Sequence, residues 1–424
     1  MYKTHPRIIF IYYLGNIFVF LGWILYIIAI PLSEKTLLSF LLYSFCLYIA
    51  SLVIFIKTKF YFLNPALLFC GFYLLTLCFG PFLLLPQNYN YYFNVFPVLA
   101  GGYICFISGY VINFLKLPKK KIHYSVLQFD REKFLYFLVL FSGIIWIIYI
   151  FKIKGILWSS DYETSRITSQ SGNGAYLYLI RMWILTVPML YEELKKRKQV
   201  PKVFYFIVSF ALIALSMLGG RSPLLFIILN IIICKIILEK LDTFILVRYS
   251  LLCLAVAGFL GSIRGILSNS TKTILKSLGS IVLNGNYNLS YIFQKFPEHI
   301  LFQKGYTYLI NFKMILPGPD DDFTLWLKKQ LGLSFSGGGV TPTIIGEFYI
   351  NFGYIGIFVG LFILGFIAKW LYLLLKQSSN KSYIAYLIIC FVTVTQGGIA
   401  NVTIPIILYT LVYCFISIFS KSKS

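Results

Sequence analysis

The stretch TIIGEFYINFGYIGIFVGLFILGFIAKWLYLLL, residues 343–375, determines the fold class. It carries only two charged side chains, Glu347 and Lys369, within a long apolar run. A helix needs about 20 apolar residues to cross the hydrocarbon core of a bilayer, whereas a strand of a membrane barrel alternates over about ten positions. Residues 343–375 therefore predict a membrane-spanning helix.

Similar apolar windows recur along the whole chain. The composition is 59% hydrophobic and 12% charged, whereas soluble domains hold roughly 45–50% apolar and about 25% charged residues. We predict an all-α, polytopic membrane bundle of about twelve transmembrane helices. The windows lie at 8–30, 36–56, 63–85, 92–115, 134–153, 175–191, 203–218, 222–238, 247–263, 343–375, 383–396 and 399–418.

The short connections between these windows alternate in their content of basic residues. Basic clusters fall at 116–133, at 195–198 and after the last window, and positive charge marks the cytoplasmic side of membrane proteins. This places both termini in the cytoplasm. The net charge of +23 then reflects topology, with a secondary attraction to anionic lipid headgroups. Nucleic acid is therefore not an expected partner.

The eight cysteines all lie inside apolar windows, without the spacing of a zinc site or a disulfide framework. The aspartates at 320–322 are consecutive and cannot easily wrap one ion, and turn formation explains them equally well. We therefore expect neither a metal nor a cofactor. The first window lacks a small-residue cleavage site and is interpreted as a retained helix.

We expect one integral membrane domain over residues 1–424, with a large extracytoplasmic loop at 265–342 and a smaller one at 154–174. The large loop holds His299, the sole outward histidine. Histidine is the commonest base near neutral pH, but a lone loop histidine is more often simply exposed. Glu298 and Glu347 are alternative bases. Glu347 is expected in the first turn of its helix, where the macrodipole stabilises an anion, so capping and pairing with an arginine stay open.

Two arginines flanked by glycine stand at predicted outer helix ends. Arg221 follows Gly219–Gly220, and Arg264 lies between Gly261 and Gly265. An arginine beside free helical N–H groups can bind an anion, and its planar guanidinium matches phosphate oxygens. We predict that the pair converges on a diphosphate, against the alternative of arginines reaching to lipid headgroups. Arg166 lies in the smaller loop, whose many hydroxyl and amide groups suit sugar recognition or an ordinary solvated loop.

Four short motifs carry a family resemblance. They are GGRSP at 219–223, GSIRG at 261–265, KGYTYL at 304–309 and SGGGVTPTIIGEFYINFG at 336–353. With the topology of about twelve spans and one large outer loop, the chain resembles the Wzy-type O-antigen (oligosaccharide repeat-unit) polymerases. One departure is Leu316-Pro317-Gly318, where the family pattern ends in arginine. If that arginine has a role, Lys313 or a more distant basic residue must supply it here.

The resemblance implies a GT-C-like membrane glycosyltransferase without a metal, in the cytoplasmic (inner) membrane of a bacterium. It would transfer a growing glycan, with inversion, from undecaprenyl diphosphate to an incoming lipid-linked repeat unit. Arg221 and Arg264 would bind the diphosphate, His299, Glu298 or Glu347 would act as base, and Arg166 and Tyr306 would contact substrate. A flippase and a chain-length regulator of the same pathway are implied partners. The alternatives are an O-antigen ligase, which differs in its acceptor, and a flippase or transporter, for which we find no internal repeat.

Overall fold

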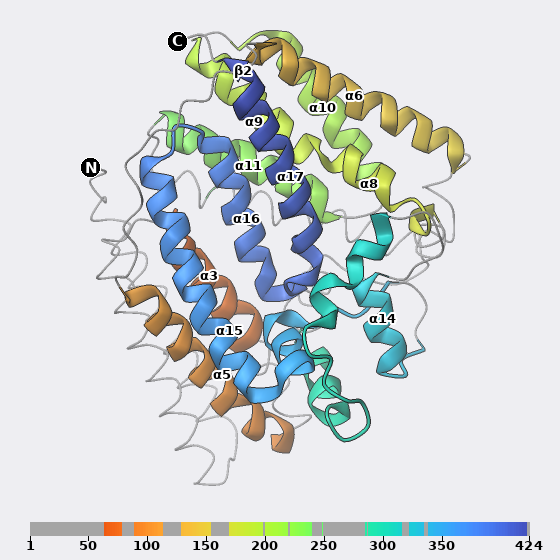
Figure 1. Cartoon of the computed structure of the whole chain (residues 1–424), viewed down its shortest axis with the longest axis vertical. Coiled ribbons are helices and arrows are strands. Elements are labelled where there is room, and N and C mark those ends of the chain that lie inside the picture. The colour runs from red at the N-terminus through yellow and green to blue at the C-terminus, as the bar shows by residue number, and fades with distance from the viewer. Residues whose placement is uncertain are drawn as a thin grey trace.

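The computed structural model is a bundle of long helices with a group of shorter ones at one end (Figure 1). It describes residues 63–78, 89–112, 129–153, 169–197, 200–218, 221–239, 248, 285, 287–315, 322–334 and 338–421. The windows predicted at 8–30, 36–56 and 247–263 lie outside this described part, apart from residue 248.

The helical fold class is confirmed, and each remaining window coincides with one or more helices. The helices are α3 (Pro65–Tyr73) continued by η1 (Leu74–Cys78), α5 (Tyr89–Val111), α6 (Arg131–Lys152), α8 (Gly174–Arg181), α9 (Trp183–Lys196), α10 (Lys202–Met217), α11 (Arg221–Glu239), α15 (Thr343–Gln377), α16 (Lys381–Gly397) and α17 (Ala400–Phe419). By length and composition, five helical stretches of the described part can cross a membrane: Arg131–Lys152, Gly174–Lys196, Ser222–Glu239, Thr343–Gln377 and Ala400–Phe419. The chain is thus a multi-pass membrane protein, while the number of twelve spans remains a prediction.

The described chain crosses back and forth between two ends of the bundle, and α8 and α9 together form one crossing. At the end we call the terminal end, a short parallel pair joins β1 (Phe129–Asp130), before α6, to β2 (Ser420–Lys421), after α17. The opposite end, which we call the loop end, carries helix 287–295, the 3-10 helix η2 (Tyr306–Ile315) and α14 (Phe323–Gln330). This arrangement gathers the described part of the 265–342 loop at one end of the bundle, while the side of the membrane on which that end lies remains a prediction.

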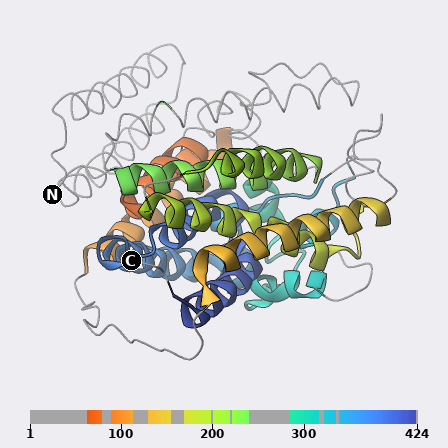
Figure 2. The ribbon, with the colours of Figure 1, turned by 90° about the horizontal axis from the view of Figure 1, so that it is seen from above.

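Helix α16 occupies the centre of the bundle. It contacts α3 and α15 on one side and α9, α11 and α17 on the other, and most of its side chains are buried. A membrane helix buried on every side suits this central place. Figure 2 shows α6, α9 and α11 as successive layers of the other half. Polar side chains join these layers, since the Trp183 indole donates to the Val139 carbonyl (2.8 Å) and Asn230 donates to that of Ile184 (2.9 Å).

A charged cluster closes the terminal end of the bundle. Glu192 and Glu193, which the sequence places in a basic cytoplasmic connection, belong to α9 and are each 1% exposed. Glu192 accepts hydrogen bonds from the N–H groups of Lys381 (3.1 Å) and Ser382 (2.8 Å) at the start of α16. Glu193 pairs with Arg131 at 3.9 Å. These charges therefore join α6, α9 and α16.

Glycines let α5 and α15 approach to backbone contact. A side chain at Gly365 would collide with the carbonyl oxygen of Phe106, and one at Gly109 with that of Phe362. Small residues permit such close helix contacts in membranes, where the hydrophobic effect does not drive helices together. Helices α5 and α15 thus pack along one side of the bundle, and α15 begins at the loop end.

We expect Gly365→Val to destabilise the protein by about 1–3 kcal/mol, because α5 must move to admit the new methyl groups. The measurement is the thermal unfolding midpoint in detergent. Gly71→Ala on α3 is the matched control, since nothing lies within 4 Å of its added carbon and alanine favours a helix. An unchanged midpoint for Gly365→Val would contradict this tight packing.

Candidate functional site

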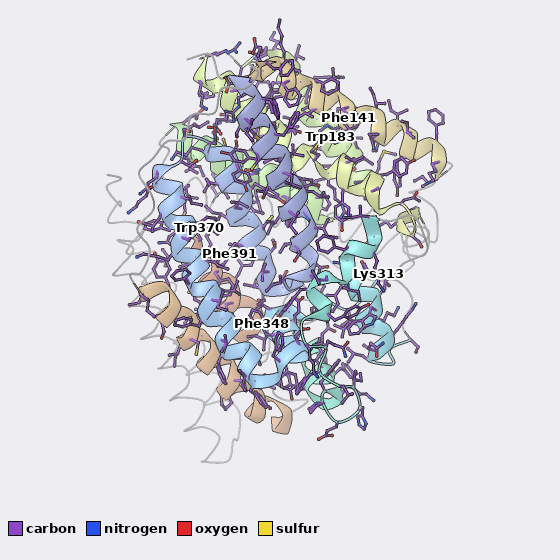
Figure 3. The ribbon with its side chains drawn as sticks, viewed as in Figure 1. Phe141, Trp183, Lys313, Phe348, Trp370 and Phe391 are labelled. Atoms are coloured by element: carbon purple, nitrogen blue, oxygen red, sulfur yellow. The ribbon has the colours of Figure 1, made fainter. Side chains whose placement is uncertain are left out.

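Helix α15 is broken near the loop end. Phe352 (φ −139°, ψ 15°) and Gly353 (φ 62°, ψ −150°) leave helical geometry and divide α15 into a short first part and a long second part. The positive φ of Gly353 suits glycine, and the Phe302 ring lies 3.1 Å from where its side chain would begin. The window 343–375 is therefore a broken helix, in which Phe348 of the first part lies against Gly360 of the second (Figure 3 labels Phe348).

A segment of the large loop covers this break. The N–H groups of Gln303 and Lys304 donate to the carbonyls of Ile350 (2.9 Å) and Asn351 (3.1 Å). The N–H of Gly305 donates to the Asn351 side-chain oxygen (2.8 Å). The last carbonyls of a helix lack partners within it, so these bonds satisfy the end of the first part of α15. Two of the resemblance motifs, at 304–309 and 336–353, are thereby in direct contact.

Thr307, Glu347 and Asn351, each 0% exposed, form a polar cluster beneath this segment. The Asn351 amide donates to the Thr307 hydroxyl (2.6 Å) and to the Glu347 carbonyl (2.8 Å). The Thr307 hydroxyl donates to the Glu347 carboxyl group (3.4 Å). Burial raises the pKa of Tyr308, which lies beside this cluster.

The Glu347 carboxyl group also caps a different helix. Its oxygens accept the N–H groups of Ile399 and Ala400 (3.0 Å for Ala400), at the start of α17. The expected place in the first turn of its own helix is wrong, because α15 begins at Thr343 and its first turn holds no acidic residue. Gly398 allows this approach, because the side chain of any other residue at this position would collide with the Glu347 carboxyl group. Its φ of 76° also favours glycine.

Asn311 extends the same network toward α14. Its amide donates to the Ala400 carbonyl (3.0 Å), and its side-chain oxygen accepts the N–H of Phe323 (2.7 Å), the first residue of α14. At 4% exposed, Asn311 is buried. The sequence analysis missed Thr307, Asn311 and Asn351, because single polar residues give no signal until the fold shows their partners.

An apolar cavity of about 380 Å³ lies between the two parts of α15 and opens beside this network. Tyr308 and Ile399 line its loop end, and the lining continues along the second part of α15 as far as Ile367. From Phe352 to Ile367 the lined face extends about 22 Å at 1.5 Å per residue. Apart from the Tyr308 hydroxyl, every side chain that the described residues contribute to this lining is apolar. The cavity can accommodate a hydrocarbon chain whose polar end faces the loop.

The predicted bases occupy different environments. Glu298 and His299 are exposed in the turn after helix 287–295, where the N–H of His299 donates to the Lys295 carbonyl (2.9 Å). Tyr306 is 43% exposed and begins η2. The ammonium of Lys313 lies 5.8 Å from the centre of the Tyr306 ring, and Figure 3 shows Lys313 on η2 at the loop end. The surface of the loop therefore presents His299, Tyr306 and Lys313, whereas Glu347 is enclosed.

The side chains of the three predicted arginines, Arg166, Arg221 and Arg264, lie outside the described part of the structure. Arg221 is the first residue of α11 at the loop end, as the sequence predicted, but only its backbone is described. Arg166 and Arg264 lie outside the described residues, as do Asp320 and Asp321. Asp322 caps α14, since it accepts the N–H of Leu325 (2.8 Å). Within the described ranges, no three His, Cys, Asp or Glu side chains gather as a metal site would require.

Arg181 was overlooked within the window 175–191. It ends α8, and its buried Nε has no hydrogen-bond partner among the described residues. An arginine costs roughly 2.5–3.5 kcal/mol at the centre of a membrane helix and less toward its ends, so the half-buried Arg181 is a candidate functional residue. A charged residue inside an otherwise apolar window could have been noted from the sequence.

The fold and the site define a multi-pass helical membrane protein with a buried polar network beside an apolar cavity. A family model described as "Putative O-antigen polymerase" matches residues 3–409, nearly the whole chain. The chain belongs to this family of membrane enzymes, which build surface polysaccharide by a glycosyltransferase-like activity on lipid-linked oligosaccharides. Neither the curated proteins nor the solved structures contain a match.

Proposed function

We propose that this protein joins undecaprenyl-diphosphate-linked oligosaccharide repeat units into a surface polysaccharide at the outer leaflet of the cytoplasmic membrane. The observation that carries the proposal is the placement of the apolar cavity directly beside the loop network of Thr307, Glu347 and Asn351. A lipid-linked saccharide has an isoprenoid chain and a polar glycan joined by a diphosphate. The cavity suits the chain, and the loop end suits the glycan.

The proposed reaction moves the growing glycan from its carrier to the incoming repeat unit. A hydroxyl of the incoming sugar attacks C1 of the growing glycan, the bond from C1 to the phosphate oxygen breaks, and the new glycosidic bond forms with inversion. The hydroxyl proton passes to a base, and undecaprenyl diphosphate leaves with the electron pair. Cationic groups stabilise the charge that develops on this leaving group, which is the proposed role of Arg221 and Arg264. We propose no metal in this step.

The remaining roles follow from exposure and contacts. His299 is proposed as the base, with Glu298 as the alternative, because both are exposed at the loop end where a sugar hydroxyl can reach them. Glu347 is proposed as a positioning residue, because its carboxyl group already accepts three donors in a fully buried site. Tyr306 offers an aromatic face for a sugar ring, and Arg166 is proposed to orient the saccharide.

The test is a strain lacking this protein, whose surface glycan is examined on a gel. We expect single repeat units in place of long chains, and the wild-type gene to restore the ladder. His299→Ala is expected to reduce long chains at least a hundredfold, the contribution of a general base, while protein abundance in the membrane stays unchanged. Normal ladders from His299→Ala would move the role to Glu298.

The same strain distinguishes the alternatives. Complete absence of attached glycan, with long chains still on the lipid carrier, would indicate the ligase. Precursor confined to the cytoplasmic leaflet would indicate a flippase or transporter. Either outcome would replace the proposed polymerase activity, while the flippase and chain-length regulator remain proposed partners only if single repeats accumulate.

A further inference from the structure

The 3-10 helix η2 presents an apolar face to its surroundings. A 3-10 helix has three residues per turn, so side chains three positions apart lie above one another. Tyr306, Leu309, Phe312 and Ile315 follow this spacing, and we call them the outer face of η2. Tyr306 and Leu309 are exposed, Leu309 to 60%, and Phe312 and Ile315 are half-buried. None of these four apolar or aromatic side chains is buried.

The opposite side of η2 holds its polar side chains. Thr307 and Asn311 are buried, where Thr307 donates to the Glu347 carboxyl group (3.4 Å) and Asn311 to the Ala400 carbonyl (3.0 Å). A helix at a boundary with water places apolar side chains inward and polar ones outward. In η2 this distribution is reversed, apart from the buried Ile310. Such a reversal is expected beside hydrocarbon, because polar groups then find hydrogen-bond partners only inside the protein.

Helix α14 of the same loop shows the ordinary distribution. Its buried side chains are Phe323 and Leu327, whereas Lys329 and Gln330 at its end are exposed. This is the pattern of a helix that contacts water. The contrast between α14 and η2 therefore indicates two different surroundings within one loop.

The contacts of η2 place it beside the ends of membrane helices (Figure 1). The Asn311 amide reaches Ala400, the first residue of α17. The Met314 carbonyl packs against Gly174, the first residue of α8. Both helices belong to stretches that can cross a membrane, and α17 exposes the apolar Leu411 farther along its length. Helix η2 therefore lies where these helices enter the membrane.

The charges of this segment also suit a membrane surface. Residues 300–315 contain Lys304 and Lys313 and no acidic residue. Tyrosine and lysine are favoured at the boundary between lipid and water, where the aromatic ring lies at headgroup level and the ammonium group reaches the phosphates. The Lys313 ammonium extends to within 5.8 Å of the centre of the Tyr306 ring, so this pair marks a polar border of the outer face.

We infer that the outer face of η2 contacts the acyl chains of the membrane leaflet at the loop end. Leu309, Phe312 and Ile315 lie among the chains, and Tyr306 lies at headgroup level. Tyr308 of the same helix lines the apolar cavity, so the cavity opens within the leaflet rather than into water. The contact of η2 with lipid does not depend on the glycan reaction, and it makes part of the 265–342 loop an interfacial segment.

The experiment uses the full-length protein, one copy per phosphatidylcholine nanodisc, with a fluorescent amino acid introduced at one position by stop-codon suppression. Bromine atoms on the lipid acyl chains quench a probe in hydrocarbon, and iodide in the buffer quenches a probe in water. At position 309 we expect bromine quenching comparable to that at Leu411, an exposed position of α17. Because an apolar region excludes ions, iodide quenching at 309 is expected to be at least about tenfold weaker than at position 330.

Gln330 of α14 is the matched control, since it is exposed on the same loop. We expect strong iodide quenching and little bromine quenching there. Equal iodide quenching at 309 and 330 would place the outer face in water and overturn the inference. Protection of position 309 from both quenchers would mean that protein covers the face, which would also overturn it.

Substitution by aspartate gives a second, independent measurement. Leu309→Asp is expected to lower the unfolding midpoint in nanodiscs by several degrees, because a charged side chain in lipid is costly. Gln330→Asp is expected to leave the midpoint unchanged, since surface substitutions in water change stability little. Equal midpoints of Leu309→Asp and the wild type would contradict the contact with lipid.

Discussion

Glu347→Ala is expected to lower the free energy of unfolding by about 3 kcal/mol, the largest stability effect of any single change considered at the loop end. The substitution leaves the N–H groups of Ile399 and Ala400 and the Thr307 hydroxyl without their acceptor in a fully buried site. Each orphaned buried donor costs about 1–3 kcal/mol. The first turn of α17 also loses the acceptor that satisfies its positive end.

The measurement is the thermal midpoint of each variant in detergent, together with its polymerisation activity. Glu347→Gln keeps the shape and one oxygen acceptor, so we expect roughly half of the loss in stability. Glu298→Gln, at an exposed position, is expected to leave the midpoint unchanged. If Glu347→Gln instead kept full stability and lost all activity, Glu347 would be the base and its positioning role would be rejected.

Val359→Trp is expected to abolish long-chain glycan while the protein stays folded. Val359 lines the apolar cavity on the second part of α15, about two turns from the break, and the indole would fill space that we assign to the isoprenoid chain. Each buried methylene of a ligand contributes about 0.8 kcal/mol. Displacing two of them therefore weakens substrate binding more than tenfold.

The control is Leu411→Trp on α17, which is 61% exposed and lies outside the cavity lining. Both variants add a large apolar side chain, so a general effect of tryptophan would affect them equally. We expect normal ladders from Leu411→Trp and single repeats from Val359→Trp, at equal abundance in the membrane. Long chains from Val359→Trp would exclude the cavity as the site of the lipid chain.

The helices were predictable because a long apolar window has few alternatives in a bilayer. The alternating basic connections predict that successive spans run in opposite directions, as the described crossings from α6 to α11 and from α15 to α17 do. The side of the membrane on which each connection lies remains a prediction. The break in α15 was not predictable in the same way. A hydropathy window averages over 19 or so residues, and Phe352 and Gly353 are apolar or small, so the average hides the change of direction.

The polar network was only partly predictable. Glu347 was recognisable as a charged residue in an apolar stretch. Its partner is the N-terminus of α17, and this contact depends on how the helices pack rather than on the local sequence. Thr307 and Asn351 are 44 residues apart, and nothing in either short motif indicates that they meet. Arg181 could have been noted from the sequence, because it is a charged residue within the window 175–191. The apolar average of that window concealed it.

The most direct test of the central claim uses purified protein in nanodiscs with one lipid-linked repeat unit as the sole substrate. We predict a ladder of longer glycans that remain attached to the lipid diphosphate, with one free undecaprenyl diphosphate released for each unit added. An unchanged single repeat, with no released carrier under conditions in which the substrate is bound, would contradict the account.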